Sequence, residues 1–189
     1  MIYNLITVSK IETWITAGYE ILGAEGAEGV KIERIARALQ LNKSGFYYYF
    51  GSMDEFMNVL VRHHVQSSHI VSAEIMDCEC VDPDLIGLIL KHKVFFLAES
   101  RLQLKNSRAP YHDDVEEVER IVNTALVSLW KKLHHSTMGN AVALAYLHMV
   151  RHFFYARIDV HEMTQPCLRN LISEVGTLLE TVSNDRHIS

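Results

Sequence analysis

The spacing of hydrophobic residues predicts helices along almost the whole chain. Between residues 32 and 39, apolar side chains recur at positions i, i+3, i+4 and i+7, which lie on one face of an α-helix. Similar spacing returns in longer segments further on, whereas the two-residue alternation of a half-buried strand persists nowhere. Only three prolines, Pro83, Pro110 and Pro166, interrupt the pattern. The sequence therefore predicts an all-α protein.

A second short helix is predicted immediately after the first, from Lys43 to Phe50. Asn42 precedes it and is a favoured N-cap, because its side-chain oxygen can accept a hydrogen bond from an otherwise unpaired backbone N–H of the first turn. Phe46, Tyr49 and Phe50 share one face of this helix and can turn inward. Two short helices joined by a tight turn indicate a helix-turn-helix. The outward face of its second helix carries Lys43, Ser44, Tyr47 and Tyr48.

Capping signals place a further helix on either side of this pair. Ser9 followed by Glu12 predicts the start of a first helix, which the glycines from Gly23 onward end. Ser52 followed by Glu55 predicts the start of a fourth helix. The N-terminal part is thus expected to hold three short helices and the beginning of a longer one.

The outward face of the second short helix suits contact with a phosphate backbone. Lysine supplies a positive charge, serine and tyrosine supply hydroxyl donors, and the small residues Ser44 and Gly45 allow close approach. Basic residues in and just before the preceding helix can add charge around it. The DNA-binding residues expected on these grounds are Lys31, Arg34, Asn42, Lys43, Ser44, Tyr47 and Tyr48.

The order of these segments resembles the N-terminal DNA-binding domain of TetR/AcrR-type transcriptional regulators. The matching pieces are the first helix ending at Gly26, then IERIARAL, then LNKSGFYYYF, then SMDEF. The resemblance implies a helix-turn-helix DNA-binding domain over residues 1–53 and a larger helical ligand-binding and dimerisation domain over residues 54–189. It also implies that the last two helices pair with those of a second copy, and that ligand occupancy changes the spacing of the two recognition helices.

Three positions depart from the residues usual in that family. Lys31 stands where threonine is usual, although its charge could still reach a phosphate. Gln40 stands where glycine is usual, so a left-handed turn residue costs more there. Met53 stands where lysine is usual and cannot replace its charge. These departures leave an alternative open, in which a helical dimer has kept the fold but binds a small molecule or protein partner without specific DNA binding.

The charge balance offers DNA no long-range attraction. From residue 1 to residue 62, six basic residues are set against seven acidic ones, a net charge of −1, and the whole chain carries −5. DNA binding therefore has to depend on the local placement of basic residues around the second short helix. Few phosphates would be neutralised, so we expect only a modest dependence on salt.

The remainder of the chain is expected to form longer helices. They cover approximately residues 56–75, 85–101, 115–133, 140–158 and 168–182. The segment 140–158 is apolar on nearly all sides, so it must be covered from several directions. A homodimer interface would cover it, and so would a central place in a monomeric core. We expect the homodimer, which would present two recognition helices to a pseudo-palindromic DNA operator.

Aromatic and histidine side chains of these helices are the candidates for a small-molecule site. Such a lining favours an apolar or aromatic effector, and Arg101 or Arg151 could hold an anionic end of it. Each candidate, taken singly, is better explained as part of the helical core. The ligand-binding candidates are Phe95, Phe96, Tyr111, Trp130, Tyr146, His148 and His152.

The sequence carries no motif of an enzyme. A Gly-x-Ser-x-Gly elbow, a His-Glu-x-x-His zinc motif and a phosphate-binding loop are all absent from it. His148 and His152 are one helical turn apart, but with no carboxylate or cysteine nearby in sequence we expect neither a metal site nor a cofactor. The three cysteines fit no disulfide framework. With no uninterrupted membrane-length apolar segment and no signal peptide, a cytoplasmic protein is expected.

Overall fold

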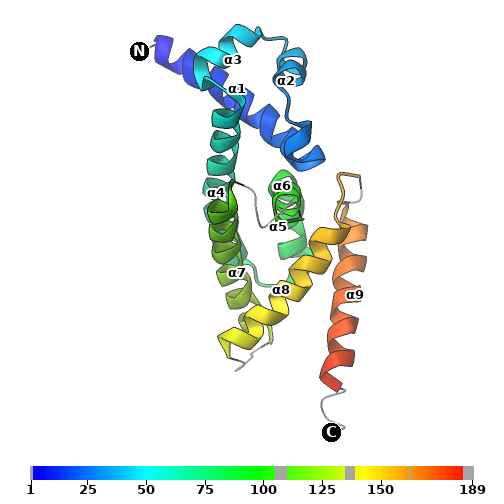
Figure 1. Cartoon of the computed structure of the whole chain (residues 1–189). Helices are drawn as coiled ribbons and strands as arrows, with labels where there is room; N and C mark the ends of the chain where they lie inside the picture. The colour runs from blue at the N-terminus through cyan, green and yellow to red at the C-terminus, as the bar shows by residue number, and fades with distance from the viewer. Residues whose placement is uncertain (1, 105–109, 135–138, 162, 185–189) are drawn as a thin grey trace.

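A computed structural model of the protein describes residues 2–104, 110–134, 139–161 and 163–184. All regular structure in these residues is helical, which confirms the all-α prediction (Figure 1). A 3₁₀ turn (Ala27–Gly29) connects α1 to α2, and a π-helical turn (Val81–Leu85) leads into α5. The α-helices are α1 (Ile2–Glu25), α2 (Ile32–Leu39), α3 (Lys43–Phe50), α4 (Met53–Asp77), α5 (Ile86–Lys91), α6 (Lys93–Leu104), α7 (His112–His134), α8 (Asn140–Arg157) and α9 (Gln165–Asn184).

Helices α1, α2 and α3 form a unit at one end of an elongated molecule (Figure 1). Its core is built mainly from aromatic rings. The Phe46 ring centroid lies 5.3 Å from that of Trp14 and 5.1 Å from that of Phe56, and all three side chains are buried. Gly18 lets α4 cross α1 closely, since a Cβ atom at this position would lie 2.6 Å from the Phe56 ring. Ring packing therefore fixes α3 against α1 and α4.

Helix α1 begins earlier than its capping signal predicts. The start predicted at Ser9 is wrong, because the helix already begins at Ile2. The segment before Ser9 holds no glycine or proline that would stop a helix, and a capping box does not by itself exclude helix upstream. The predicted end is confirmed. The helix ends at Glu25, and Gly26 follows it with a φ of 79°, a conformation that glycine adopts at little cost.

Helix α4 connects the N-terminal unit to the rest of the molecule. Ser52 caps it as predicted, since its hydroxyl accepts a hydrogen bond from the Glu55 backbone N–H at 3.1 Å. The first turns, including Phe56, pack into the aromatic core, whereas later turns, including Val71, pack into a second core. One continuous helix therefore belongs to both cores. The division of the chain between residues 53 and 54 stays a prediction.

The second core lies in the body formed by the later helices. Helix α7 packs along α4, while α6 packs on α1 and also contacts α8 (Figure 1). The single helix predicted over 85–101 is wrong, because the chain breaks at His92 (φ −102°, ψ 31°) into α5 and α6. The break is not marked by glycine or proline. It places the His92 ring nitrogen Nε2 2.9 Å from the Glu74 carboxylate of α4, a tertiary contact that a local pattern cannot reveal.

One side of α8 is not covered by the other described helices of the chain. The helix coincides with the predicted segment, and Leu147 and Tyr155 are buried on its inner side. On the outer side, Leu144 is 38% exposed and Met149 is 52% exposed. The expected covering from several directions is therefore not complete within one chain. None of the helices in the described ranges has the length and apolar character needed to cross a membrane.

Candidate functional site

The turn between α2 and α3 has the geometry of a helix-turn-helix. Gln40 ends α2 in the left-handed region (φ 55°, ψ 36°), and the Leu41 backbone N–H donates to the Ala36 carbonyl at 2.9 Å. Asn42 then caps α3, because its side-chain oxygen accepts a hydrogen bond from the Ser44 backbone N–H at 3.0 Å. The N-cap predicted at Asn42 is confirmed. Together these contacts fix the direction in which α3 leaves the turn.

Helix α3 has one face in the core and one face in solvent. Phe46 and Phe50 are buried, and Tyr49 packs at the edge of the aromatic core. Tyr47 is 52% exposed and Tyr48 is 83% exposed. Two neighbouring aromatic side chains thus face solvent on a helix that the core holds in place, so this outward face is the candidate for contact with another molecule.

The basic residues around α3 are paired with carboxylates. Arg34 makes a two-pronged ion pair with Glu25, and the Lys43 ammonium lies 3.2 Å from the Glu33 carboxylate. The Arg34 guanidinium lowers the pKa of the Glu25 carboxyl. Hydrogen bonds from its own backbone N–H and from Lys43 lower the pKa of the Glu33 carboxyl. Carboxylates of the same chain thus partly balance the positive charges of Arg34 and Lys43.

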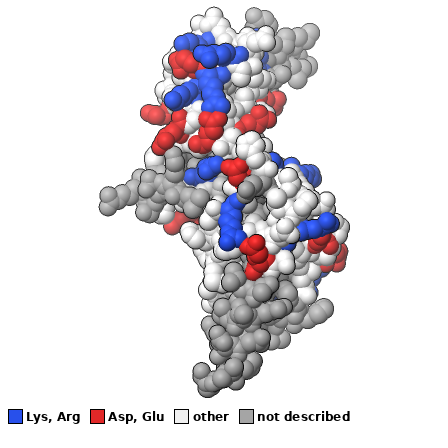
Figure 2. Space-filling view, turned by 90° about the vertical axis from the view of Figure 1, so that its right-hand side faces the viewer, with Lys and Arg blue, Asp and Glu red and all other residues white. Residues whose placement is uncertain are grey.

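The charge distribution over this end of the molecule is mixed. Figure 2 shows lysine and arginine side chains gathered at the end that holds α2 and α3, with acidic side chains next to them. Lys31 is also exposed there, immediately before α2. Exposed ion pairs in water are weak, so a phosphate oxygen can take the place of a carboxylate on Arg34 or Lys43.

The comparison with known families agrees with this geometry. The family model for bacterial regulatory proteins, tetR family, matches residues 15–60, which run from α1 through α2 and α3 into α4. Residues 15–60 therefore form a DNA-binding domain of the tetR-family type. The match covers the whole helix-turn-helix and the start of α4, the part of the molecule built around the aromatic core. No curated protein matches the chain.

The match supports a DNA-binding regulator, the role of the tetR family. The match ends at residue 60, so it does not extend to the body that would receive an effector. What the body can do therefore has to be argued from its own residues.

The aromatic ligand-binding candidates lie in three separate places. Phe95 and Phe96 of α6 are buried in the second core, with ring centroids 5.3 Å apart. Tyr111, which precedes α7, packs against the aromatic core of the N-terminal unit instead. Trp130 of α7 and Tyr146 of α8 contact each other with ring centroids 5.7 Å apart. The structure does not bring these side chains into one pocket.

The two histidine candidates lie at the surface of α8. Both His148 and His152 are exposed, and Nδ1 of His148 lies 3.0 Å from the Glu119 carboxylate of α7. Across the described part of the chain, no three histidine, cysteine or acidic side chains are grouped so that they could hold a metal ion.

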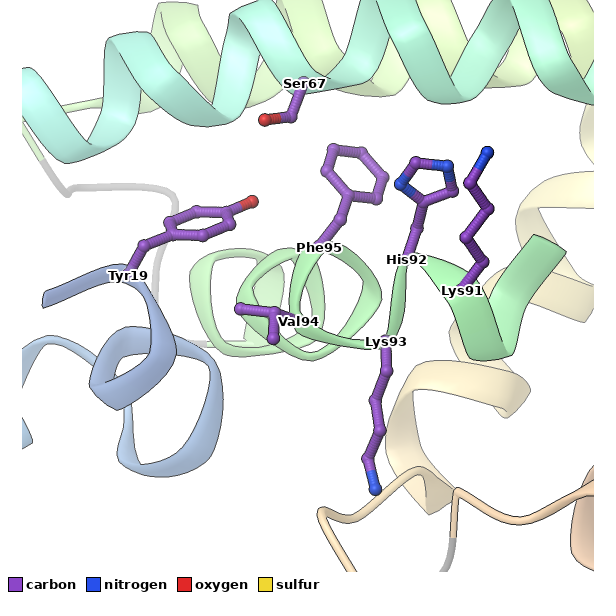
Figure 3. Close-up of a pocket in the computed structure, with 7 residues that line it drawn as sticks. All are labelled: Tyr19, Ser67, Lys91, His92, Lys93, Val94 and Phe95. Carbon is purple, nitrogen blue, oxygen red and sulfur yellow. The ribbon is translucent and has the colours of Figure 1, made fainter. Parts of the chain in front are cut away.

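A pocket of about 210 Å³ opens between α1, α4 and the break that separates α5 from α6. In Figure 3 the Tyr19 side chain reaches it from α1, and the Phe95 ring reaches it from α6. The cations at its rim already have partners. Lys91 and His92 contact Glu74, and the Lys93 ammonium donates to a backbone carbonyl. The lining residues are Tyr19, Ser67, Lys91, His92, Lys93, Val94 and Phe95.

The body also holds a buried polar network that was not foreseen from the sequence. Arg151, a candidate partner for an anionic effector, is instead paired with Glu99 at 2.9 Å, and both side chains are buried. His64 and Asn123 are buried beside them. One signal was present in the sequence, because Glu99 follows Phe95 by one helical turn and so falls on the apolar face of α6.

Proposed function

We propose that this protein is a ligand-responsive transcriptional regulator, a homodimeric repressor that binds a pseudo-palindromic DNA operator and responds to a small molecule. The observation that carries the proposal is the outward face of α3. It is held in place by an aromatic core and a capped turn, and it lies within the segment that matches the tetR family. A DNA-binding regulator of this kind would work in the cytoplasm.

The DNA contacts in this proposal are divided between phosphates and bases. Lys43 and Ser44 lie at the start of α3, where a lysine ammonium and a serine hydroxyl suit a phosphate. Tyr47 and Tyr48 extend from the exposed face and are placed to reach base edges or sugar. Flanking contacts come from Lys31, Arg34 and Asn42.

The outer side of α8 supports a homodimer. Among its described residues this side carries neither an acidic residue nor a permanent cation, and its two large apolar side chains, Leu144 and Met149, are more than one-third exposed. A second copy of the same helix would remove this surface from water, and a two-fold axis would set two α3 helices toward one face of DNA. The exposed residues on this side are Ala141, Leu144, Ala145, His148, Met149, His152 and Ala156.

The effector in this proposal is a small apolar or aromatic molecule bound among the helices of the body. Of the candidates Phe95, Phe96, Tyr111, Trp130, Tyr146, His148 and His152, Phe95 lines the described pocket, and the structure does not bring the other six to it. The effector must prefer one arrangement of the dimer over the other, because a molecule with equal affinity for both shifts no population.

Selection of bound duplexes from a random DNA pool, at low and at moderate salt, tests the proposal. We expect an enriched inverted repeat. On that repeat, Lys43→Ala should weaken binding for all sequences and reduce the slope of log affinity against log salt by about 1, whereas Tyr47→Phe should have a smaller effect. Glu33→Gln is the matched control, since it frees Lys43 from its carboxylate and should strengthen binding. Undiminished affinity after Lys43→Ala would remove the role assigned to this residue.

A second candidate function is a helical dimer that binds a small molecule or a protein partner without specific DNA binding. The pairing of Arg34 and Lys43 with carboxylates favours it, and so does Met53, whose side chain packs against the aromatic core. A folded dimer that enriches no sequence from the pool would support this candidate instead.

A further inference from the structure

A chain of buried hydrogen bonds crosses the molecule from the N-terminal unit to α8. The Tyr19 hydroxyl of α1 lies 2.6 Å from Nδ1 of His64 in α4. On the other side of the ring, Nε2 of His64 lies 2.6 Å from Oε2 of Glu99 in α6. Oε1 of Glu99 accepts a hydrogen bond from Arg151 of α8 at 2.9 Å. All four side chains are buried.

Neighbouring side chains complete the chain at its charged end. Gln103 donates to Oε1 of Glu99 at 2.6 Å. Arg151 also donates to the Asn123 side-chain oxygen and, at 3.2 Å, to the Tyr155 hydroxyl. The opposite charges of Glu99 and Arg151 balance each other, and both carboxylate oxygens accept hydrogen bonds. Removing one partner of such a pair would leave the other charge buried without compensation.

The positions of the hydrogen atoms follow from these partners. A carboxylate only accepts hydrogen bonds, so Nε2 of His64 must carry a hydrogen that it donates to Glu99. In the neutral ring Nδ1 is then bare and accepts the hydrogen of the Tyr19 hydroxyl. Burial, and then the charge of Glu99, raise the pKa of Tyr19 well above its ordinary value, so this hydroxyl keeps its hydrogen. Every donor from Tyr19 to Glu99 has an acceptor when His64 is neutral.

Protonation of His64 breaks this match at one point. The new hydrogen lies on Nδ1 and faces the Tyr19 hydroxyl, whose own hydrogen then loses its acceptor in a buried place. An unpaired buried donor is costly, and separation of α1 from α4 relieves it. The bonds from His64 to Glu99 and from Glu99 to Arg151 stay favourable. Among the hydrogen bonds of this chain, added charge therefore disturbs the contact with α1.

One other histidine among the described residues lies close to His64. His63 is half-buried, its ring centroid lies 4.8 Å from that of Tyr19, and burial lowers its pKa. The Phe95 ring stacks on His64 at 4.7 Å and shields it from water. The groups facing His64 are Tyr19 from α1, His63 from α4, and Phe95 and Glu99 from α6, with Arg151 of α8 behind Glu99.

Helix α1 is well placed to pass such a change to the recognition helix. Its C-terminal end lies directly on α6, where Arg101 donates to the Ala24 carbonyl at 3.3 Å. Its middle carries Trp14, which packs against Phe46 of α3. A shift of α1 at Tyr19 therefore moves the element on which α3 is seated.

We propose that His64 is a proton-operated switch that ties the DNA-binding helices to the body when it is neutral and loosens them when it is protonated. The consequence for DNA affinity rests on the proposed function, whereas the loosening of α1 does not. Histidine is the side chain suited to this task, since it changes charge near neutral pH.

Hydrogen exchange of the α1 backbone amides in the full-length protein tests the switch without DNA. From about pH 7.5 to about pH 5.5, the range in which histidines titrate, the protection factors of α1 should fall by at least about fivefold in the wild type, relative to those of α7. In His64→Gln they should stay within about twofold. Glutamine has an N–H for Glu99 and an oxygen for Tyr19, and it does not titrate.

Two further variants separate the switch from its alternatives. Tyr19→Phe removes the hydroxyl, so α1 should be weakly protected at both pH values and the pH dependence should disappear, even if His64→Gln does not fold. His63→Gln is the matched control and should keep the wild-type pH dependence. The proposal is overturned if Tyr19→Phe or His64→Gln keeps that dependence, or if His63→Gln loses it.

DNA binding gives an independent test of the switch once the selection has supplied a duplex that the protein binds. Affinity of the wild type should fall on acidification over the same range more steeply than that of His64→Gln. Hydrogen exchange needs no DNA. If the selection from the random DNA pool fails, that result counts against the proposed function, while hydrogen exchange still tests the switch. A steeper wild-type loss of affinity with unchanged protection of α1 would contradict a switch that acts by loosening this helix.

Discussion

The two cores of this molecule are held together by different kinds of interaction. The core of the N-terminal unit is formed mainly by packed rings, and among the described side chains of α1, α2 and α3 none that is charged is buried. The core of the body encloses the buried pair of Glu99 and Arg151, with His64 and Asn123 beside it. One core therefore depends on shape and the other also depends on charge and on the direction of hydrogen bonds.

This difference suits different tasks. Ring packing carries no charge that changes with pH, so it holds α3 against α1 and α4 under most conditions. A buried polar chain has few satisfied arrangements, and the loss of one partner is expensive. The N-terminal unit is thus suited to presenting a fixed surface, and the body is suited to switching between states. Substitutions in the two cores should therefore differ in the size of their effect and in its dependence on charge.

Removing one charge from the body should be the most damaging change. Arg151→Met leaves Glu99 buried without its main partner, so we expect the free energy of unfolding to fall by about 4 kcal/mol. Equilibrium unfolding in urea, followed by circular dichroism, measures it.

The double variant Glu99→Gln with Arg151→Met is the control for this prediction. It removes both charges and keeps an acceptor for His64, so the protein should recover a good part of the lost stability. If the loss in free energy of unfolding in the double variant equals the sum of the losses in Glu99→Gln and Arg151→Met, the loss comes from packing. In that case the two cores do not differ in their dependence on charge.

Truncation of a ring in the N-terminal core should have the next largest effect. Phe46→Ala removes a fully buried side chain that contacts Trp14, Phe50 and Phe56, and should lower the free energy of unfolding by about 3 kcal/mol. Urea unfolding at about pH 7.5 and about pH 5.5 should give the same loss at both. Tyr48→Ala, on the exposed face of the same helix, should change stability by less than about 0.5 kcal/mol. A loss that varied strongly with pH would show that the ring core is not independent of charge.

The N-terminal unit was largely predictable from sequence because its signals are local. The spacing from Ile32 to Leu39, the cap at Asn42 and the cap at Ser52 each act within one or two turns, and the structure confirms all three. The inward face of α3 was predictable for the same reason. The start of α1 was wrong, because a capping signal does not show what precedes it.

The polar network of the body was not predictable, because its partners come from distant parts of the chain. His64, Glu99 and Arg151 lie in three different helices, and each sits in a segment that has the pattern of an ordinary apolar helix. The break at His92 was not predictable for a similar reason, since its contact with Glu74 is tertiary. Hydrophobic spacing shows which face of a helix is buried, but not which polar groups meet there.

A smaller effect is expected at the turn that aims α3. Asn42→Ala removes the side-chain oxygen that accepts from Ser44, so the free energy of unfolding should fall by about 1 kcal/mol. Asn42→Asp keeps an acceptor and should retain nearly all of the stability. Urea unfolding of the two variants measures the difference. If both variants lose the same free energy of unfolding, the stability depends on the Asn42 amide group and not on the capping hydrogen bond.

The smallest effect concerns the left-handed residue in the same turn. Gln40 has a φ of 55°, which strains a residue with a Cβ atom, whereas glycine adopts it freely. Relief of this strain opposes the greater freedom that glycine gives the unfolded chain. Because strain in the left-handed region is of order 1 kcal/mol, we expect relief to prevail and Gln40→Gly to raise the free energy of unfolding, measured in urea, by about 0.5 kcal/mol. Gln40→Ala, which keeps the Cβ atom, should change it little. A loss of stability in Gln40→Gly would show that unfolded-state freedom outweighs strain, and that the N-terminal unit tolerates this turn without penalty.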